Sequence, residues 1–202
     1  MHKARNQRAG KKCIFYIIIL VCSFFFLYSL LFKPSVLIDV AVTILFFAAL
    51  YYYDRKTNLS IGAVLLLSLA IILNPLGLLF NFYSYFVIGV VGYDKLIHFV
   101  GGFAVVYALS QNFPGKRTAL SYVIIILVLL GLGTIIEINE FIGFRYLGID
   151  NGGIFTIEDT LPVVRSDLQR FDTYFDILFN LAGALSAVLF LVFRKKYWHS
   201  KS

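Results

Sequence analysis

The stretch TALSYVIIILVLLGLGTIIEINEFI, residues 118–142, is an apolar run whose only charged residues are Glu137 and Glu140. A helix needs about 20 apolar residues to cross the hydrocarbon core of a bilayer, so this stretch predicts a transmembrane helix. Similar runs occupy residues 13–32, 36–53, 61–79, 95–110 and 172–193. We therefore expect an all-α fold, a polytopic membrane helix bundle with about six transmembrane helices in a single domain over residues 1–202.

The composition supports this class. Of the 202 residues, 60% are hydrophobic and 14% charged, and the mean hydropathy is +0.85, well above that of ordinary soluble domains. The run at 95–110 is short for a span. It is expected to be extended by the apolar residues 82–91, either as one longer tilted helix or as a helix broken at Gly89 or Gly92.

Basic residues predict the orientation. With both termini in the cytoplasm, thirteen of the 18 Lys and Arg residues lie on that side, within segments 3–12, 55–56, 116–117 and 194–201. This distribution follows the positive-inside rule and predicts a multi-pass protein of the cell (plasma) membrane. The net charge of +7 is spread over short segments that flank spans, so membrane lipids are the expected partners, and nucleic acid is not.

Ionisable and amide residues recur at helical spacing in the last three runs. Seven of them are candidate catalytic residues: Asp94, His98, Glu137, Glu140, Asp172, Asp176 and Asn180. With the predicted orientation and a rise of about 1.5 Å per residue, all seven fall in the outer half of the bilayer. Charged groups inside a membrane are costly and usually functional, so the set predicts a site near the outer leaflet.

Several of these residues also have a purely structural interpretation. Asp94 and Asp172 are predicted to begin helices, where a carboxylate caps backbone N–H groups. His98 and Asn180, each taken alone, suit hydrogen bonds between packed helices. Glu137 and Glu140 are harder to explain because they lie at a helix C-terminus, where the helix dipole disfavours anions. They require a cation, which Lys95, His98, an arginine of the outer loop or a metal ion could supply.

Glycines near these residues predict close helix packing. Small residues let transmembrane helices approach each other. Those in the last three runs are Gly101, Gly102, Gly131, Gly133 and Gly183 with Ala187.

Three motifs carry a resemblance to a known group. They are Tyr93-Asp94-Lys95-x-x-His98 with Gly101-Gly102, Glu137-x-x-Glu140-Phe141, and Phe171-Asp172-Thr173-x-x-Asp176 with Asn180 and Gly183. Together they resemble the VanZ-like superfamily of small bacterial and archaeal membrane proteins, and most closely its YjdF-type relatives, over about residues 93–187. The superfamily's name is associated with glycopeptide-antibiotic resistance, and its biochemical activity is not established. The resemblance therefore implies a site but no particular reaction.

Three classes of function fit the sequence. In the first, His98, Glu137, Glu140 and Asp176 bind a divalent metal (Mg, Mn or Zn), and the protein acts on lipid-borne or cell-envelope substrates. In the second, the same residues form the site of a cation- or proton-linked transporter or of a ligand-binding protein. In the third, the carboxylates serve helix pairing in a structural or partner-binding subunit. The polar outer loop at 143–171 is expected either to cover the site or to be a solvated linker.

Overall fold

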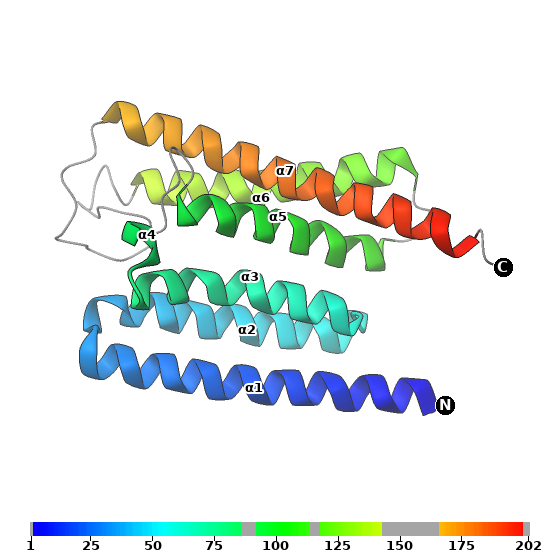
Figure 1. Cartoon of the computed structure of the whole chain (residues 1–202), viewed down its shortest axis with the longest axis horizontal. Coiled ribbons are helices and arrows are strands. Elements are labelled where there is room, and N and C mark those ends of the chain that lie inside the picture. Colours follow the sequence, from blue (N-terminus) through cyan, green and yellow to red (C-terminus); the bar gives the residue numbers. More distant parts are fainter. Residues whose placement is uncertain (1, 86–91, 114–117, 143–165, 200–202) are drawn as a thin grey trace.

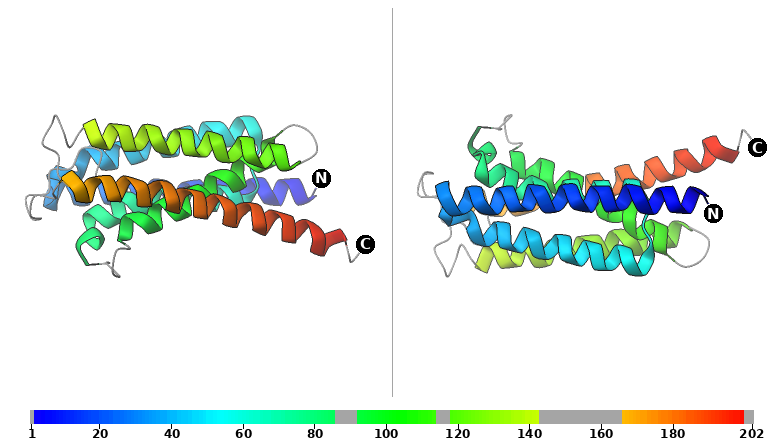
Figure 2. Two further views of the ribbon diagram at one scale, coloured as in Figure 1. Left: turned by 90° about the horizontal axis from the view of Figure 1, so that it is seen from above. Right: turned by 90° about the horizontal axis from the view of Figure 1, so that it is seen from below.

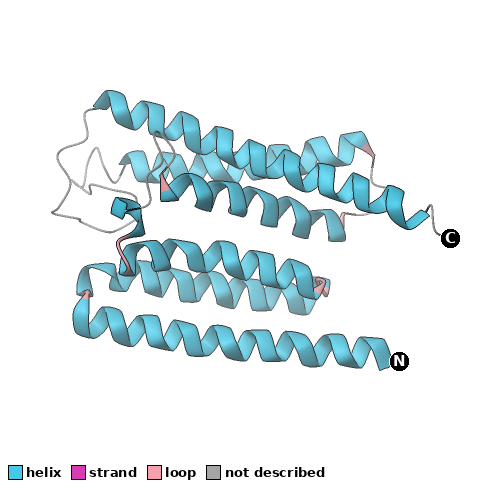
Figure 3. Cartoon of the chain, viewed as in Figure 1, coloured by secondary structure: helices cyan, strands magenta, loops and turns pink. Residues whose placement is uncertain are grey.

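The computed structural model describes residues 2–85, 92–113, 118–142 and 166–199, and these are helical except for short connections (Figure 3). The elements are α1 (His2–Phe32), the 3-10 helix η1 (Pro34–Val36), α2 (Leu37–Thr57), α3 (Ile61–Leu79), α4 (Phe82–Tyr85), α5 (Tyr93–Asn112), α6 (Ala119–Ile142) and α7 (Ser166–His199). No strand occurs in these ranges. The expected all-α membrane helix bundle is confirmed.

Five segments are long and apolar enough to cross a membrane. They are Ala9–Phe32, Pro34–Thr57, Ile61–Leu79, Ala119–Ile138 and Thr173–Arg194. Helix α5 is not among them, although its 20 residues are sufficient in length, because polar residues stand at both of its ends. Its position explains how it tolerates them: α5 lies between α3 and α7 and is shielded from the surroundings of the bundle by these neighbours (Figure 1).

The bundle consists of two groups of three helices. Helices α1, α2 and α3 pack on one another, and α5, α6 and α7 form the second group, within which the α5–α7 contact is the most extensive in the chain. Contact between α3 and α5 joins the two groups (Figure 1). Helix α1 begins and α7 ends at one end of the bundle, whereas α5 begins, α6 ends and α7 begins at the other (Figures 1 and 2).

The start of α5 is held against α3 by Tyr93. Its hydroxyl donates a hydrogen bond to the backbone carbonyl of Leu73 at 2.9 Å, and its ring lies where a Cβ at Gly77 would stand, only 2.4 Å away. A side chain at Gly77 would therefore displace Tyr93. Because Asp94, Lys95 and His98 follow Tyr93 within the first two turns of α5, this contact fixes the position of those residues relative to the N-terminal group.

Helix α5 begins abruptly. Gly92 has an extended backbone, with φ −85° and ψ 174°, and helical geometry starts at Tyr93. One continuous helix running through Gly92 into α5, which was one of the two expected forms, is therefore wrong. The other expected break point, Gly89, lies outside the described residues.

Two helices differ in extent from the sequence expectation at their N-termini. Helix α1 begins at His2, well before residue 13, and α7 begins at Ser166, six residues before Asp172. The last part of the predicted outer loop is thus helical. The rest of that loop, residues 143–165, lies outside the described residues, so its expected role as a cover or a linker stays untested.

Candidate carboxylate and histidine site

Three helices each contribute one metal-ligating side chain to a single place in the bundle. His98 comes from the second turn of α5, Glu137 from the last turns of α6, and Asp176 from α7. One ligand atom from each of the three lies within 4.8 Å of the other two. The chain thus assembles residues separated by up to 78 positions in sequence, as the polar layer predicted for the last three helices requires.

The distances between these ligand atoms are short. Nε2 of His98 lies 3.3 Å from Oδ1 of Asp176 and 3.7 Å from Oε1 of Glu137. Around a tetrahedral ion with bonds of about 2.1 Å, neighbouring ligand atoms stand about 3.4 Å apart. Both distances are close to that separation, so the imidazole needs little movement to share an ion with either carboxylate.

The cluster is buried. Glu137 is 4% exposed and Asp176 is 2% exposed, and the His98 side chain is 15% exposed. Ionised carboxylates are costly to bury unless cations or hydrogen-bond donors compensate them. Each charge that faces this cluster therefore has a large effect on the free energy of its ionised carboxylates.

Lys95 supplies one such charge. Its Nζ lies 2.5 Å from Oδ2 of Asp94 and 2.7 Å from Oδ1 of Asp176, and its side chain is 3% exposed. The lysine therefore joins the first turn of α5 to α7. Among the described residues, this cluster holds three carboxylates, those of Asp94, Glu137 and Asp176, and one lysine. When His98 is neutral and the carboxylates are ionised, the cluster carries an excess of negative charge that favours a further cation.

Asn180 orients the imidazole from the side away from the carboxylates. Its Nδ2 lies 3.1 Å from Nδ1 of His98. With the amide in this orientation, Asn180 donates to Nδ1, and the proton of a neutral imidazole is on Nε2, facing the carboxylates. If Nε2 is to bind a metal, the proton must move to Nδ1 and the amide must turn so that its oxygen accepts it.

Two glycines allow α5 and α7 to approach closely beside the cluster. A Cβ at Gly183 would stand 2.1 Å from the carbonyl oxygen of Phe99, and one at Gly102 would stand 2.4 Å from the carbonyl oxygen of Asn180. Both contacts are with backbone, which cannot move aside as a flexible side chain can. A Cβ at Gly133 on α6 would stand 3.0 Å from Nδ2 of Asn180, so this glycine also makes room for the amide.

The other predicted glycines have no such role. In the described part of the chain, nothing lies within 4 Å of a Cβ built at Gly101 or Gly131. Of the five glycines expected to permit close packing, three therefore do so, and these three lie at the contacts of Asn180 or Phe99.

The capping interpretation is corrected at both aspartates. Asp172 is preceded by six residues of α7, so it is not at a helix N-terminus. Asp94 lies in the first turn of α5, where the helix dipole favours an anion, but the N-cap residue is Gly92, which has no side chain to cap the helix. Asp94 instead forms an ion pair with Lys95.

The seven candidate residues divide into two sets. The structure brings together Asp94, His98, Glu137, Asp176 and Asn180. Glu140 and Asp172 lie on α6 and α7, but their side chains fall outside the described residues, so the predicted role of Glu140 as a metal ligand stays a prediction. Lys95 is central to the cluster and was not among the candidates, although its place between Asp94 and His98 in an apolar run is the signal that identifies it.

The fold and this cluster define a multi-pass α-helical membrane protein with a buried site of carboxylates, one imidazole and one lysine. Residues 12–197 match the family described as predicted membrane protein (DUF2238), so the chain belongs to that family. Among curated proteins and solved structures, none matches the chain.

Proposed function

We propose that His98, Glu137 and Asp176 bind a divalent metal ion, and that the protein uses this centre on lipid-borne or cell-envelope substrates. The observation that supports the metal is the convergence of one imidazole and two carboxylates from three helices at ligand-to-ligand distances of 3.3 and 3.7 Å. Oxygen and imidazole ligands suit Zn or Mn, and Mg if water completes the shell.

Lys95 and the proposed ion would compete for one oxygen atom of Asp176. The Oδ1 atom of Asp176 that accepts from Lys95 is also the atom nearest His98. An ion would therefore either bind the second oxygen of Asp176 or displace the lysine toward Asp94. In both cases Lys95 and the metal compete for the same negative charge, which gives the proposal a specific test.

The substrate class rests on the predicted orientation. With the termini in the cytoplasm, the start of α5 and the end of α6 face the outer leaflet, where envelope precursors and lipid headgroups are accessible. The finer resemblance to the VanZ-like superfamily and its YjdF-type relatives agrees with a cell-envelope role. Both the orientation and this resemblance are parts of the proposal.

One observation favours a second function. Lys95 and Asp176 join α5 to α7, the most extensively packed pair of helices, so the cluster can also serve only to pair helices. In that case the carboxylates need no ion beyond the lysine, and the chain is a structural or partner-binding subunit.

Metal content and thermal stability together distinguish the metal centre from the helix-pairing role. Protein purified in detergent, as wild type and as Glu137→Gln and His98→Ala, is analysed for metals and melted before and after chelation. Thr134→Val is the matched control, because Thr134 is exposed on α6 one turn from Glu137 and its hydroxyl donates to the backbone carbonyl of Leu130. We expect near-stoichiometric metal and a melting temperature that falls on chelation in the wild type and control, with both effects lost in the other two variants.

The helix-pairing alternative predicts a different pattern. No metal would then co-purify, chelation would leave melting unchanged, and re-addition of Zn, Mn or Mg would not stabilise the wild type. That result would exclude the metal centre.

A further inference from the structure

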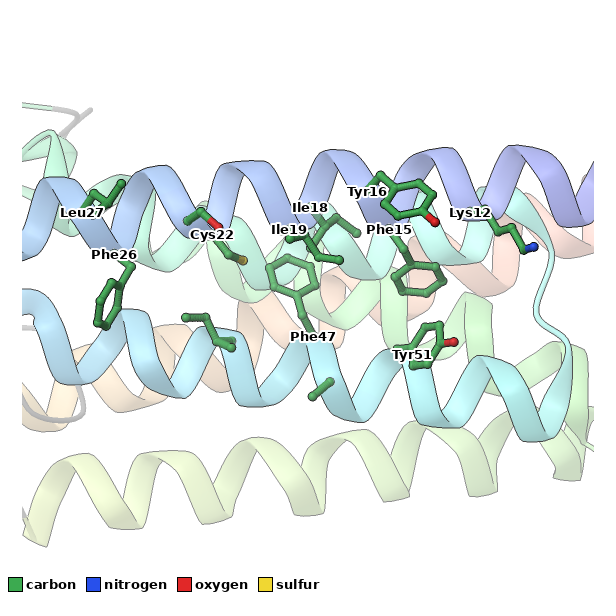
Figure 4. A pocket seen from close by; sticks show the side chains of 13 residues that line it. Lys12, Phe15, Tyr16, Ile18, Ile19, Cys22, Phe26, Leu27, Phe47 and Tyr51 are labelled. Carbon is green, nitrogen blue, oxygen red and sulfur yellow. The ribbon is translucent and has the colours of Figure 1, made fainter.

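A long apolar groove runs between α1 and α2, at a distance from the carboxylate and histidine site. Its volume is about 890 Å³. Its floor is buried and consists of Ile18, Cys22 and Phe47, whereas its rims carry exposed side chains such as Ile19 and Leu27 (Figure 4). In a membrane such a groove faces lipid, and its two ends differ in chemistry.

One end of the groove is polar. Lys12, Tyr16 and Tyr51 line it there, with the Lys12 ammonium and the tyrosine hydroxyls close to the same end (Figure 4). Nη1 of Arg55 lies 3.5 Å from the Tyr51 hydroxyl and adds a second cation. Tyrosines and basic residues mark the membrane–water interface, and this end is the one at which α1 begins, on the predicted cytoplasmic side.

The positive charge at this end is not compensated by the nearest acid. Asp54, on the last turn of α2, is engaged by the neighbouring Lys11 at 2.7 Å, and Lys11 also donates to Asn58. Among the described residues, no carboxylate forms an ion pair with Lys12. Lys12 is thus available to an anion from outside the chain.

The groove also has the length of a lipid chain. It follows α1 from Lys12 to Leu27, and the fifteen steps between these residues extend about 22 Å at 1.5 Å per step. One leaflet of a bilayer contributes about 15 Å of hydrocarbon, half of a core of about 30 Å. A complete acyl chain can therefore lie along the groove with its headgroup beside Lys12.

We propose that this groove binds one anionic glycerophospholipid, with its phosphate at Lys12 and an acyl chain over Ile18, Cys22 and Phe47. A second copy of the chain fits less well. A two-fold axis along the membrane normal would bring Lys12 of each copy to the same level of one interface, where the like charges repel.

Native mass spectrometry in detergent tests the proposal with phosphatidylglycerol and phosphatidylcholine as probes, added to delipidated full-length protein. We expect phosphatidylglycerol to bind with at least about fivefold preference, the effect of one basic residue at an anionic headgroup, and Lys12→Gln to remove the preference while Lys12→Arg keeps it. Ala48→Trp fills the groove and should abolish retention of the lipid, since Ala48 lines it.

Two matched controls make the test specific. Lys56→Gln removes the same charge at the same end of α2, where Lys56 lies over the Tyr52 ring and does not line the groove. Ala49→Trp adds the same bulk at an exposed position next to Ala48. Both should retain phosphatidylglycerol. The proposal would be overturned if the two lipids were retained equally or if Lys12→Gln had no effect. It would also be overturned by a dimer that Ala48→Trp dissociates, and this result would identify a second copy as the occupant.

Discussion

Nζ of Lys95 lies 2.7 Å from Oδ1 of Asp176, so a buried ion pair joins the first turn of α5 to α7. Both side chains are 3% exposed, and the pair stands within an apolar bundle. Removal of one partner from a buried pair leaves an uncompensated charge, which is more costly than the absence of both. The pair therefore affects both the packing of α5 against α7 and the binding of a further cation by the cluster.

The first prediction concerns the stability that this pair provides. Asp176→Asn should destabilise the fold by about 3 kcal/mol, near the lower end for buried pairs, because Asp94 remains beside Lys95. The double variant Lys95→Met with Asp176→Leu should recover part of that loss, since it removes both charges of this pair, although Asp94 then loses its ion pair with Lys95. Melting in detergent measures both. A double variant less stable than Asp176→Asn would show that the ion pair stabilises the fold more than the apolar side chains that replace it.

The second prediction uses Lys95 alone. If Lys95 competes with a metal for Asp176, Lys95→Gln should raise the affinity for Zn or Mn about tenfold at neutral pH, because it removes a cation 2.7 Å from a ligand oxygen. Titration calorimetry on chelator-treated protein measures the change. Weaker metal binding in Lys95→Gln than in the wild type would mean that the lysine positions Asp176 rather than competes for it.

The third prediction tests the glycine contact between α5 and α7. Gly183→Ala should destabilise the protein by about 3 kcal/mol or more, because its Cβ would stand 2.1 Å from the Phe99 carbonyl oxygen and backbone must move. Gly101→Ala is the matched control on α5. No described residue lies within 4 Å of its Cβ, so this variant should be neutral or stabilise by up to about 1 kcal/mol through helix propensity. Equal melting temperatures for the two variants would show that the helices are not packed this closely.

Sequence patterns predicted the helices well because a bilayer constrains them strongly. Runs of about 20 apolar residues, such as 118–142, can hardly fold as anything but helices in lipid. Helix α5 was predicted over 95–110 and extends over Tyr93–Asn112, but it is not among the segments apolar enough to cross a membrane. Its polar residues lower its mean hydropathy, and what compensates them is its position between α3 and α7, which local sequence does not contain.

The site was predictable in its residue types and not in its pairings. The spacing of polar residues on three helices indicated that His98, Glu137 and Asp176 lie at one level, and the structure brings them together. Lys95 was expected only as one of several possible partners of the glutamates, and its ion pairs with Asp94 and Asp176 were not predicted. Helical spacing gives depth in the membrane, but which groups meet depends on the rotation of each helix about its axis, and that rotation is set by contacts such as those of Gly183 and Gly102.

The start of α7 shows a related limit. Polar residues in 166–171 suggested a loop, and Asp172 was therefore interpreted as a cap. The helix instead extends beyond the apolar run to Ser166. Hydropathy reports where the bilayer ends, and a helix can continue past that point.

The last prediction concerns the hydrogen bond between Asn180 and His98. Metal binding through Nε2 requires a proton on Nδ1, and Asn180, 3.1 Å from that atom, must then accept it through its amide oxygen. Asn180→Leu should therefore weaken metal binding about 10- to 100-fold, while Asn180→Asp, which only accepts, should bind as tightly as the wild type or more so. Metal titrations of the three proteins give these affinities, and a melting curve of each chelated sample checks that the fold persists. If Asn180→Leu and Asn180→Asp bound metal equally, the amide would have no part in orienting the imidazole for metal binding.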